Sequence, residues 1–262
     1  MPDPSWYRSP REFVAVDGPD ALSYLHSQTS QDLMPLRVGA STWTFLLEPT
    51  GRIAVLARVF RRGEESFVLD VDAGYGDALT ARLARFKIRV KAEISPLPWS
   101  CVAVRGAPSP TSAGSATASG TGGSVVVAGG TDPTAGYDLF GPAPEPPPGV
   151  AEGSTADLER WRITVAWPAM GAEINDETIP GETGILDAAV SFTKGCYPGQ
   201  ELVERMDSRG SAAPFHLVVL DRVAGDAPGG DVVHDGAVVG TITSVGTTQV
   251  LARVRRGVEV AR

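Results

Sequence analysis

The chain has 262 residues, of which 42% are hydrophobic and 21% are charged, a composition typical of a soluble globular protein rather than a disordered or fibrous one. Its 23 lysines and arginines against 31 aspartates and glutamates give a formal net charge of −8, which disfavours direct nucleic-acid binding. The sequence has no apolar run long enough to span a membrane and no secretory signal pattern at its start, so we expect a cytoplasmic protein without a membrane partner.

The first part of the chain predicts helices alternating with strands. Asp17 can cap a helix that begins near Pro19, since apolar side chains then recur at helical spacing. Residues 43–47 and 53–60 predict a hairpin around the turn-like EPTGR, and residues 73–86 predict an amphipathic helix. This alternation favours an α+β fold.

Two segments have compositions that cannot form a packed core. Residues 107–124 contain only Ala, Gly, Pro, Ser and Thr, and residues 141–149 read GPAPEPPPG. We expect the first to be a surface insertion and the second an extended linker. Beyond residue 214, short β-branched runs separated by Gly, Asp and Pro predict a small antiparallel barrel or sandwich.

The block KGCYPGQE, residues 194–201, is the most unusual feature of the sequence. Its Pro-Gly pair suits a type II turn, and residues 200–208 predict a helix whose amino end lies near Cys196. A helix amino terminus and the ammonium group of Lys194 would both stabilise a thiolate, so we expect a lowered pKa for the Cys196 thiol. This cysteine could be a nucleophile, a ligand or a redox handle. Alternatively, it is a small hydrophobic side chain in a tight loop.

Other candidate residues are more weakly marked. Cys101 alternates with valines in a predicted strand, which indicates a core position, and we expect both cysteines to be free thiols. Glu182, in the turn-rich IPGETG, could line the same cleft as Cys196 or be a solvated loop carboxylate. The three histidines are not spaced as a metal pair, so we predict no metal site. The sequence signatures of dithiol redox proteins, zincins, esterases and P-loop proteins are absent.

KGCYPGQE resembles the signature of the YgfZ family, folate-binding relatives of the glycine cleavage T-protein that assist iron-sulfur proteins. Family-like segments occur in the same order over roughly residues 12–256, namely YLHSQTSQDL, LLEPTGRI, RFKIRVKAEI, WRITVAWPAMGAEI and IPGETG. The resemblance implies an α+β, T-protein-like ring of three domains around a central opening that holds a reduced folate. It also implies a ferredoxin-like layer and a small C-terminal β-barrel.

The expected domain division combines this resemblance with the breaks in composition. It assigns residues 1–45 and 155–210 to a discontinuous folate-binding domain, 46–140 to a ferredoxin-like α+β domain with the insertion at 107–124, 141–154 to a Pro-rich linker, and 211–262 to the β-barrel domain.

The resemblance also implies which residues form the site. Cys196 is the residue most closely tied to activity, and Lys194 acts with it. The rest of the functional loop is Gly195, Tyr197, Gly199, Gln200 and Glu201, and the tetrahydrofolate or derivative is expected to contact Arg162, Glu182, Tyr197 and Asp32. The folate-recognising glutamate of the T-protein falls on Thr164 in this chain, and a hydroxyl cannot accept two pterin N–H groups as a carboxylate does.

The function implied by the resemblance is a folate-dependent accessory factor that supports assembly or repair of iron-sulfur clusters in client enzymes, and through them tRNA modification. Its partners would be iron-sulfur client proteins or the cluster-assembly machinery. The enzyme alternative is a T-protein-like aminomethyltransferase, in which Glu182 or Asp32 assists proton transfer. No segment matches the T-protein's catalytic aspartate region, which favours the non-enzymatic factor. A third alternative is a folate-free module in which Arg253, Arg255 and Arg256 bind an acidic partner.

Overall fold

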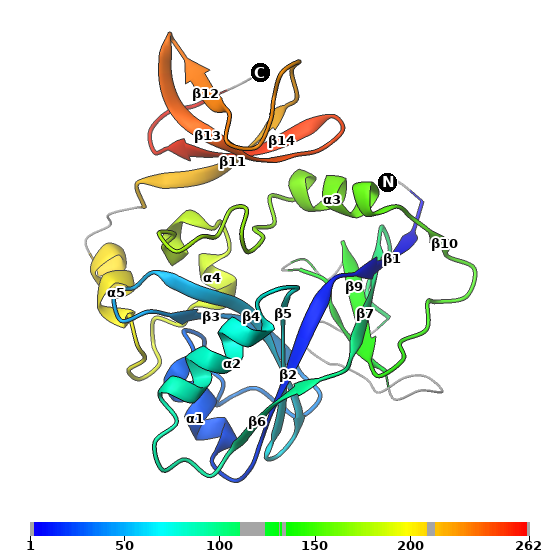
Figure 1. The fold of residues 1–262 in the computed structure, drawn as a ribbon, viewed down its shortest axis with the longest axis vertical. Coiled ribbons are helices and arrows are strands. Elements are labelled where there is room, and N and C mark those ends of the chain that lie inside the picture. Colours follow the sequence, from blue (N-terminus) through cyan, green and yellow to red (C-terminus); the bar gives the residue numbers. More distant parts are fainter. Residues whose placement is uncertain (1–2, 111–123, 131, 133–134, 209–212, 261–262) are drawn as a thin grey trace.

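The computed structural model describes residues 3–110, 124–130, 132, 135–208 and 213–260. Within these ranges the strands form three β-sheets, two of five strands and one of four, with short helices packed around them (Figure 1). The predicted α+β fold class is confirmed. In the same ranges, no helix is long and apolar enough to cross a membrane.

The central sheet is antiparallel throughout and has the strand order β3-β4-β5-β2-β6. Its strands are β2 (Arg11–Asp17), β3 (Ser41–Leu47), β4 (Ile53–Gly63), β5 (Ser66–Asp72) and β6 (Glu93–Leu97). The predicted hairpin is confirmed as the pair β3 and β4.

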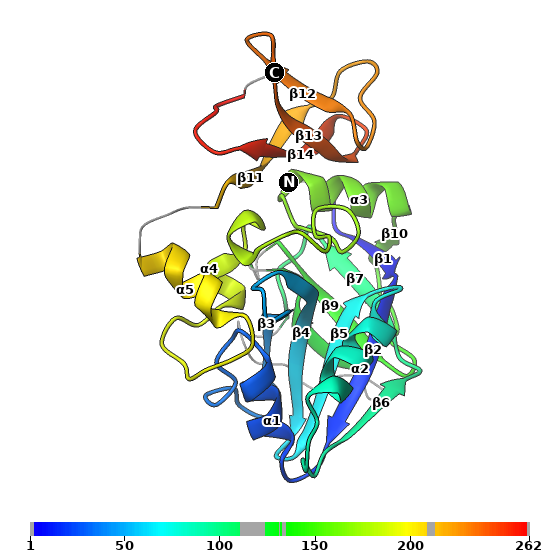
Figure 2. The same ribbon diagram turned by 60° about the vertical axis from the view of Figure 1, so that its left-hand side comes forward.

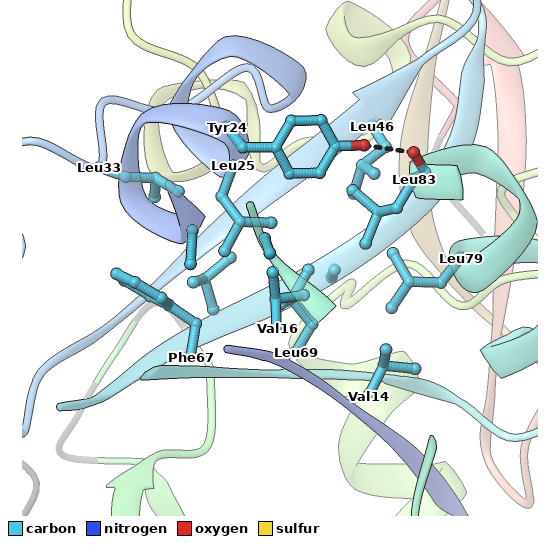
Figure 3. Packing of buried hydrophobic residues seen from close by; sticks show 14 of the residues in the cluster. Val14, Val16, Tyr24, Leu25, Leu33, Leu46, Phe67, Leu69, Leu79 and Leu83 are labelled. Atoms are coloured by element: carbon cyan, nitrogen blue, oxygen red, sulfur yellow. Dashed lines mark hydrogen bonds between the residues drawn. The ribbon is translucent and has the colours of Figure 1, made fainter. Parts of the chain in front are cut away.

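Helices α1 (Ala21–Gln28) and α2 (Gly76–Arg85) cover one face of the central sheet (Figure 2). Their apolar side chains, among them Leu25 and Leu83, join Val14 and Phe67 of the sheet in a dry core (Figure 3). The hydroxyl of Tyr24 donates to the carbonyl of Leu83, which ties the two helices together.

The predicted helix cap at Asp17 is wrong. Helix α1 starts at Ala21 with Asp20 as its N-cap residue. Asp17 instead ends β2, where its carboxylate accepts hydrogen bonds from Arg62 and Ser66. The carboxylate of Asp17 therefore bonds the guanidinium of Arg62 at the end of β2 and does not cap the helix.

The second five-stranded sheet has the order β10-β1-β7-β9-β8. Its strands are β1 (Ser5–Ser9), β7 (Ser100–Arg105), β8 (Val125–Ala128), β9 (Gly136–Gly141) and β10 (Ala151–Glu152). A shared cluster of apolar side chains, including Phe13, Phe60, Cys101 and Phe140, packs it against the central sheet. Residues 111–123 of the predicted insertion lie outside the described residues.

The predicted β region beyond residue 214 forms a four-stranded antiparallel sheet, and a separate core of valines, leucine and isoleucine packs against it. It consists of β11 (Phe215–Asp221), β12 (Asp231–His234), β13 (Ala237–Val245) and β14 (Gln249–Arg255). This sheet lies above α3 (Thr155–Thr164) in both views (Figures 1 and 2). Helix α3 begins with a capping box between Ser154 and Asp157.

The middle of the chain folds into short elements between the sheets. These are the 3₁₀ turn η1 (Pro180–Glu182), α4 (Leu186–Ala189) and α5 (Gln200–Ser208). The expected domain division stays a prediction. The boundary expected between residues 45 and 46 falls inside β3, which pairs with β4. Strands from both expected domains therefore belong to the central sheet.

Candidate functional site

A cavity of about 260 Å³ lies where α3 meets the two five-stranded sheets. Three indole rings line it, from Trp43 of β3, Trp161 of α3 and Trp167 just after α3, and we call it the tryptophan cavity. The rings of Trp43 and Trp167 are 4.7 Å apart between centroids, at an angle of 57°. Binding sites for small molecules commonly measure about 300–1,000 Å³ and are mostly apolar, so this cavity suits the ring system of a ligand rather than a large molecule.

A chain of buried ion pairs forms one side of the tryptophan cavity. Arg58, only 1% exposed, pairs with Asp70 of the central sheet at 2.9 Å and with Asp138 of the second sheet at 2.8 Å. Arg11 and Arg105 extend the chain at either end, to Asp70 and Asp138 respectively, at 2.8 Å each. Burial by itself would raise the pKa of Asp138, but the charges of Arg105 and Arg58 outweigh burial and lower it. Asp138 therefore presents a carboxylate, not a carboxylic acid, to the cavity.

Arg105 offers an unused donor at this site. Its guanidinium lies over the ring of Trp161, 4.3 Å from the centroid, and its Nη1 bonds Asp138. Its Nε is buried and has no hydrogen-bond partner among the described residues. Leaving a buried donor unpaired costs roughly 1–3 kcal/mol, and a bound molecule would reach this Nε only if the Arg105 side chain shifted.

Arg162 also lines the tryptophan cavity, but its donors are already used. Its guanidinium donates to both oxygens of Glu159, to Glu173, to the carbonyl of Trp167 and to the hydroxyl of Ser244. These bonds use all five N–H groups of an arginine. Arg162 therefore joins α3 to the following loop and to β13, and it has no donor left for a ligand.

Thr164 lies outside this cavity. It is exposed at the end of α3, where hydrogen bonds join its hydroxyl to the carbonyl of Arg160 and to Gln249 of β14. The position that the resemblance matches to the folate-recognising glutamate thus contacts the C-terminal sheet.

The loop of residues 194–201, which we call the Cys196 loop, has the predicted local structure. Gly199 has a φ of +82°, and the N–H of Gln200 donates to the carbonyl of Tyr197 at 3.3 Å, as a type II turn requires. The predicted helix follows as α5. Cys196 is a free thiol on the surface, and it does not line the tryptophan cavity.

Lys194 fixes this loop to the end of α1. Its ammonium donates to the backbone carbonyls of His26, Thr29 and Gln31, and the residue is only 9% exposed. Burial lowers the pKa of Lys194 to about 8, with the charge of Asp32 acting in the opposite direction. Three carbonyls occupy all three N–H donors, so no donor is left for the thiol. The predicted effect of Lys194 on Cys196 stays a prediction.

Tyr197 and Asp32 lie near Lys194, whose Nζ is 5.0 Å from the centroid of the Tyr197 ring. The Tyr197 ring is buried beside Phe45 and other apolar side chains, and burial, together with the charge of Glu204, raises the pKa of its hydroxyl to about 12. Asp32 is partly exposed and accepts from the backbone N–H of Met34.

Glu182 lies in another place, at the C-terminal sheet. It is 3% exposed, and both its oxygens accept from Arg253 of β14, at 3.0 and 3.1 Å. The side chain of Arg253 is therefore committed to an internal ion pair. Of the remaining loop residues, Gly195 is exposed, Gln200 bonds Glu204, and Glu201 pairs with Arg205.

The structure thus separates the predicted site residues into three groups. Asp32, Lys194 and Tyr197 surround the end of α1 beside Cys196, Arg162 lies at the tryptophan cavity, and Glu182 lies at the C-terminal sheet. Of the residues that line the cavity, sequence reasoning proposed Arg162 as a site residue and missed the others, because most of them come from distant parts of the chain. The only signal in the sequence was the pair of tryptophans in WRITVAW.

No family model matches the chain. A protein from Chaetomium globosum named "Iron-sulfur cluster assembly factor IBA57 homolog, mitochondrial" is 28% identical over 275 residues, which cover 94% of this chain. A protein of the same name from Pyricularia oryzae is 28% identical over 76% of this chain, and an uncharacterized protein from Haemophilus influenzae is 24% identical over 76%. The matches span 62% of the Chaetomium protein and 53% of the Pyricularia protein.

The fold is that of the glycine cleavage T-protein. The crystal structure of glycine cleavage system aminomethyltransferase T from Bartonella henselae matches with a TM-score of 0.76 at 17% identity, over 98% of this chain and 80% of that one. This match confirms the predicted T-protein-like fold. The chain is thus similar in sequence, over most of its length, to two proteins named iron-sulfur cluster assembly factor IBA57 homolog, and similar in fold to the glycine cleavage T-protein.

Proposed function

We propose that this protein binds tetrahydrofolate or a derivative in the tryptophan cavity and supports assembly or repair of iron-sulfur clusters in client enzymes of the cytoplasm. The observation that carries the folate part is the cavity itself, lined by three indole rings and by the charged side chains of Arg105 and Asp138, in a fold of the T-protein type. The cluster-assembly part is supported by the names of the relatives from Chaetomium and Pyricularia.

The residues of the tryptophan cavity fit the chemistry of a pterin. A pterin is a flat ring with N–H donors and a carbonyl acceptor on its edge, and indole rings stack well on such faces. Arg105 lines the cavity, and its guanidinium places a positive charge beside the ring carbonyl. The oxygens of Asp138 each accept one bond within the protein, and a carboxylate has about four lone-pair sites, so it can also accept a pterin N–H. Asp138 thus supplies the carboxylate that Thr164 lacks.

Cys196 has a different part in this proposal. Its thiol is exposed on the loop that Lys194 and Gly199 hold in place, outside the folate cavity. An exposed thiol is accessible to a protein partner, whereas a group inside the cavity is not. We therefore assign Cys196 to the contact with the iron-sulfur client or the cluster-assembly machinery, and folate to a separate site.

A direct test is calorimetric titration of the purified chain with tetrahydrofolate. We expect saturable binding, weakened at least tenfold, or by about 1.4 kcal/mol, by Trp161→Leu, because the substitution removes the stacking surface. Trp6→Leu is the matched control, since Trp6 is half-buried and lies outside the cavity. Absence of saturable binding, or equal weakening by the two substitutions, would count against the folate site.

The cellular part is tested by deleting the gene and measuring aconitase-type cluster enzymes under oxidative stress. We expect reduced activities that the wild-type gene restores and Cys196→Ala does not. Normal activities in the deletion strain would contradict the cluster role, and full rescue by Cys196→Ala would contradict the role of the thiol.

The T-protein fold also favours testing the enzyme alternative directly. The purified chain would be incubated with the glycine cleavage partner proteins and tetrahydrofolate. Formation of methylene-tetrahydrofolate would establish an aminomethyltransferase and replace the accessory role.

A further inference from the structure

A second cavity, of about 570 Å³, runs along α2 on the other side of β4 from the tryptophan cavity, and we call it the α2 groove. Its wall and floor come from α2, the start of β4 and the loop of residues 170–176. Among the described residues, only Met170 lines both cavities. The α2 groove is therefore a separate site from the proposed folate site and from Cys196.

One buried arginine lines the α2 groove without a direct ion pair among the described residues. Arg82 is 5% exposed. Its Nε and Nη2 donate to the carbonyl of Leu47 at 3.1 and 2.6 Å, and its Nη1 donates to the side-chain oxygen of Gln28 at 3.3 Å. The guanidinium also lies 4.3 Å from the centroid of the Phe86 ring. All of these partners are uncharged.

This arrangement differs from that of every comparably buried arginine in the described part of the chain. Those whose side chains are at most 13% exposed each pair with a carboxylate, namely Arg11, Arg58, Arg61, Arg105 and Arg162. A buried charge without a direct ion pair is costly, and burial lowers the pKa of Arg82 although the charge of Glu48 acts in the opposite direction. Three of its five N–H groups are used within the protein, so two remain for an anion.

The chemistry of the groove selects the kind of anion. Ala54, Ala78 and Met170, which are exposed or half-buried, give it an accessible apolar lining. At its edge the carboxylate of Glu48, which pairs with Arg85 at 3.5 Å, and that of Asp176 disfavour a ligand with two negative charges. A planar guanidinium matches the geometry of a carboxylate.

We propose that the α2 groove binds a small monocarboxylate, with its carboxylate on Arg82 and its apolar body against Ala54, Ala78 and Met170. The bound carboxylate gives Arg82 the direct ion pair that no described carboxylate provides. The apolar lining favours an alkyl or aromatic acid over a purely polar one.

The test is titration of the purified full chain with hexanoate, followed by NMR chemical shifts. We expect saturable binding, with 1-hexanol at least tenfold weaker because it lacks the charge, and with inorganic phosphate also weaker because it has no apolar body. Arg82→Gln should weaken hexanoate at least tenfold. Tetrahydrofolate affinity should be unchanged in every variant used here, which separates this proposal from the folate site.

A variant that keeps Arg82 tests the proposal even if Arg82→Gln does not fold. Ala81 is exposed and lines the groove, whereas Ala84 is exposed on the same helix and does not. Ala81→Trp should fill the groove and abolish hexanoate binding, and Ala84→Trp should leave it unchanged. Equal binding by the two tryptophan variants, or hexanol binding as tightly as hexanoate, would overturn the proposal. If Arg82→Gln does not fold, the pair of alanine variants decides.

Discussion

The tryptophan cavity and the Cys196 loop are built in opposite ways. The cavity takes its lining residues from positions between Ser9 and Met170, and a buried chain of ion pairs holds its wall. The Cys196 loop is eight consecutive residues on the surface, fixed at two points, the Lys194 ammonium and the Gly199 turn. In the proposed function, the pre-shaped cavity takes the small ligand, whereas the exposed thiol contacts the larger partner.

This comparison predicts where substitutions destabilise the protein most. Replacing Arg58 by methionine should lower the free energy of unfolding by about 3–5 kcal/mol, because it leaves Asp70 and Asp138 buried without their shared counterion. Urea denaturation measures the effect. Arg62→Met is the matched control, since Arg62 pairs with Asp17 where both are exposed, and it should cost under about 1 kcal/mol. Similar losses for the two variants would show that the wall of the cavity does not depend on its ion pairs.

On the Cys196 loop, the largest effect should come from the charge of Lys194. Its pKa is about 8 in the folded chain against 10.5 in the unfolded chain, so between these pH values the unfolded chain binds more protons. The free energy of unfolding should therefore rise with pH across this window, by up to about 3 kcal/mol, and the cost of the buried charge remains fully present below pH 8. Urea denaturation of wild type and Lys194→Met from pH 7.5 to 10.5 gives the slope of the free energy of unfolding against pH for each protein. The rise should be missing in the variant, and equal slopes would contradict the prediction.

The turn of the Cys196 loop could be predicted from the sequence, but the hydrogen bonds of Lys194 that hold the loop could not. Pro198 and Gly199 specify a type II turn through their own backbone preferences, and α5 follows from local spacing. The acceptors of Lys194 are carbonyls at the end of α1, more than 160 residues earlier in the chain. No local pattern encodes such a contact, so the sequence suggested the neighbouring thiol as the partner of the ammonium instead.

The tryptophan cavity also depends on contacts between distant residues, which the sequence alone does not predict. Alternating helices and strands predict an α+β fold, because periodicity is a property of each element alone. Arg105 and Trp161 come together only when α3 crosses the end of the second sheet, so no local pattern pairs them, although Trp161 belongs to a family-like segment. The resemblance to a known family supplied the fold type and pointed to Arg162, whose donors turned out to be used within the protein.

Gly199 gives a sharper test of how the loop is held. An added Cβ would lie 2.5 Å from the carbonyl oxygen of Glu48, and the φ of +82° is unfavourable for any other residue. Gly199→Ala should therefore cost about 1–3 kcal/mol in the free energy of unfolding, measured by urea denaturation. Gly195→Ala is the control within the same loop, because nothing lies within 4 Å of its Cβ position, and its cost should be under about 0.5 kcal/mol. A small loss for Gly199→Ala would mean that the loop can shift at no cost.

The smallest effect on stability is expected at the residue that matters most for the proposed function. Cys196 is exposed, so Cys196→Ala should change the free energy of unfolding by less than about 0.5 kcal/mol. Cys101 is 3% exposed between the two five-stranded sheets, and Cys101→Ala should cost about 1–2 kcal/mol because it leaves a cavity. Thermal and urea denaturation of the two variants compare them directly. If Cys196→Ala were as destabilising as Cys101→Ala, the thiol would be part of the packing of the loop, and loss of rescue in cells would no longer indicate a contact with a partner.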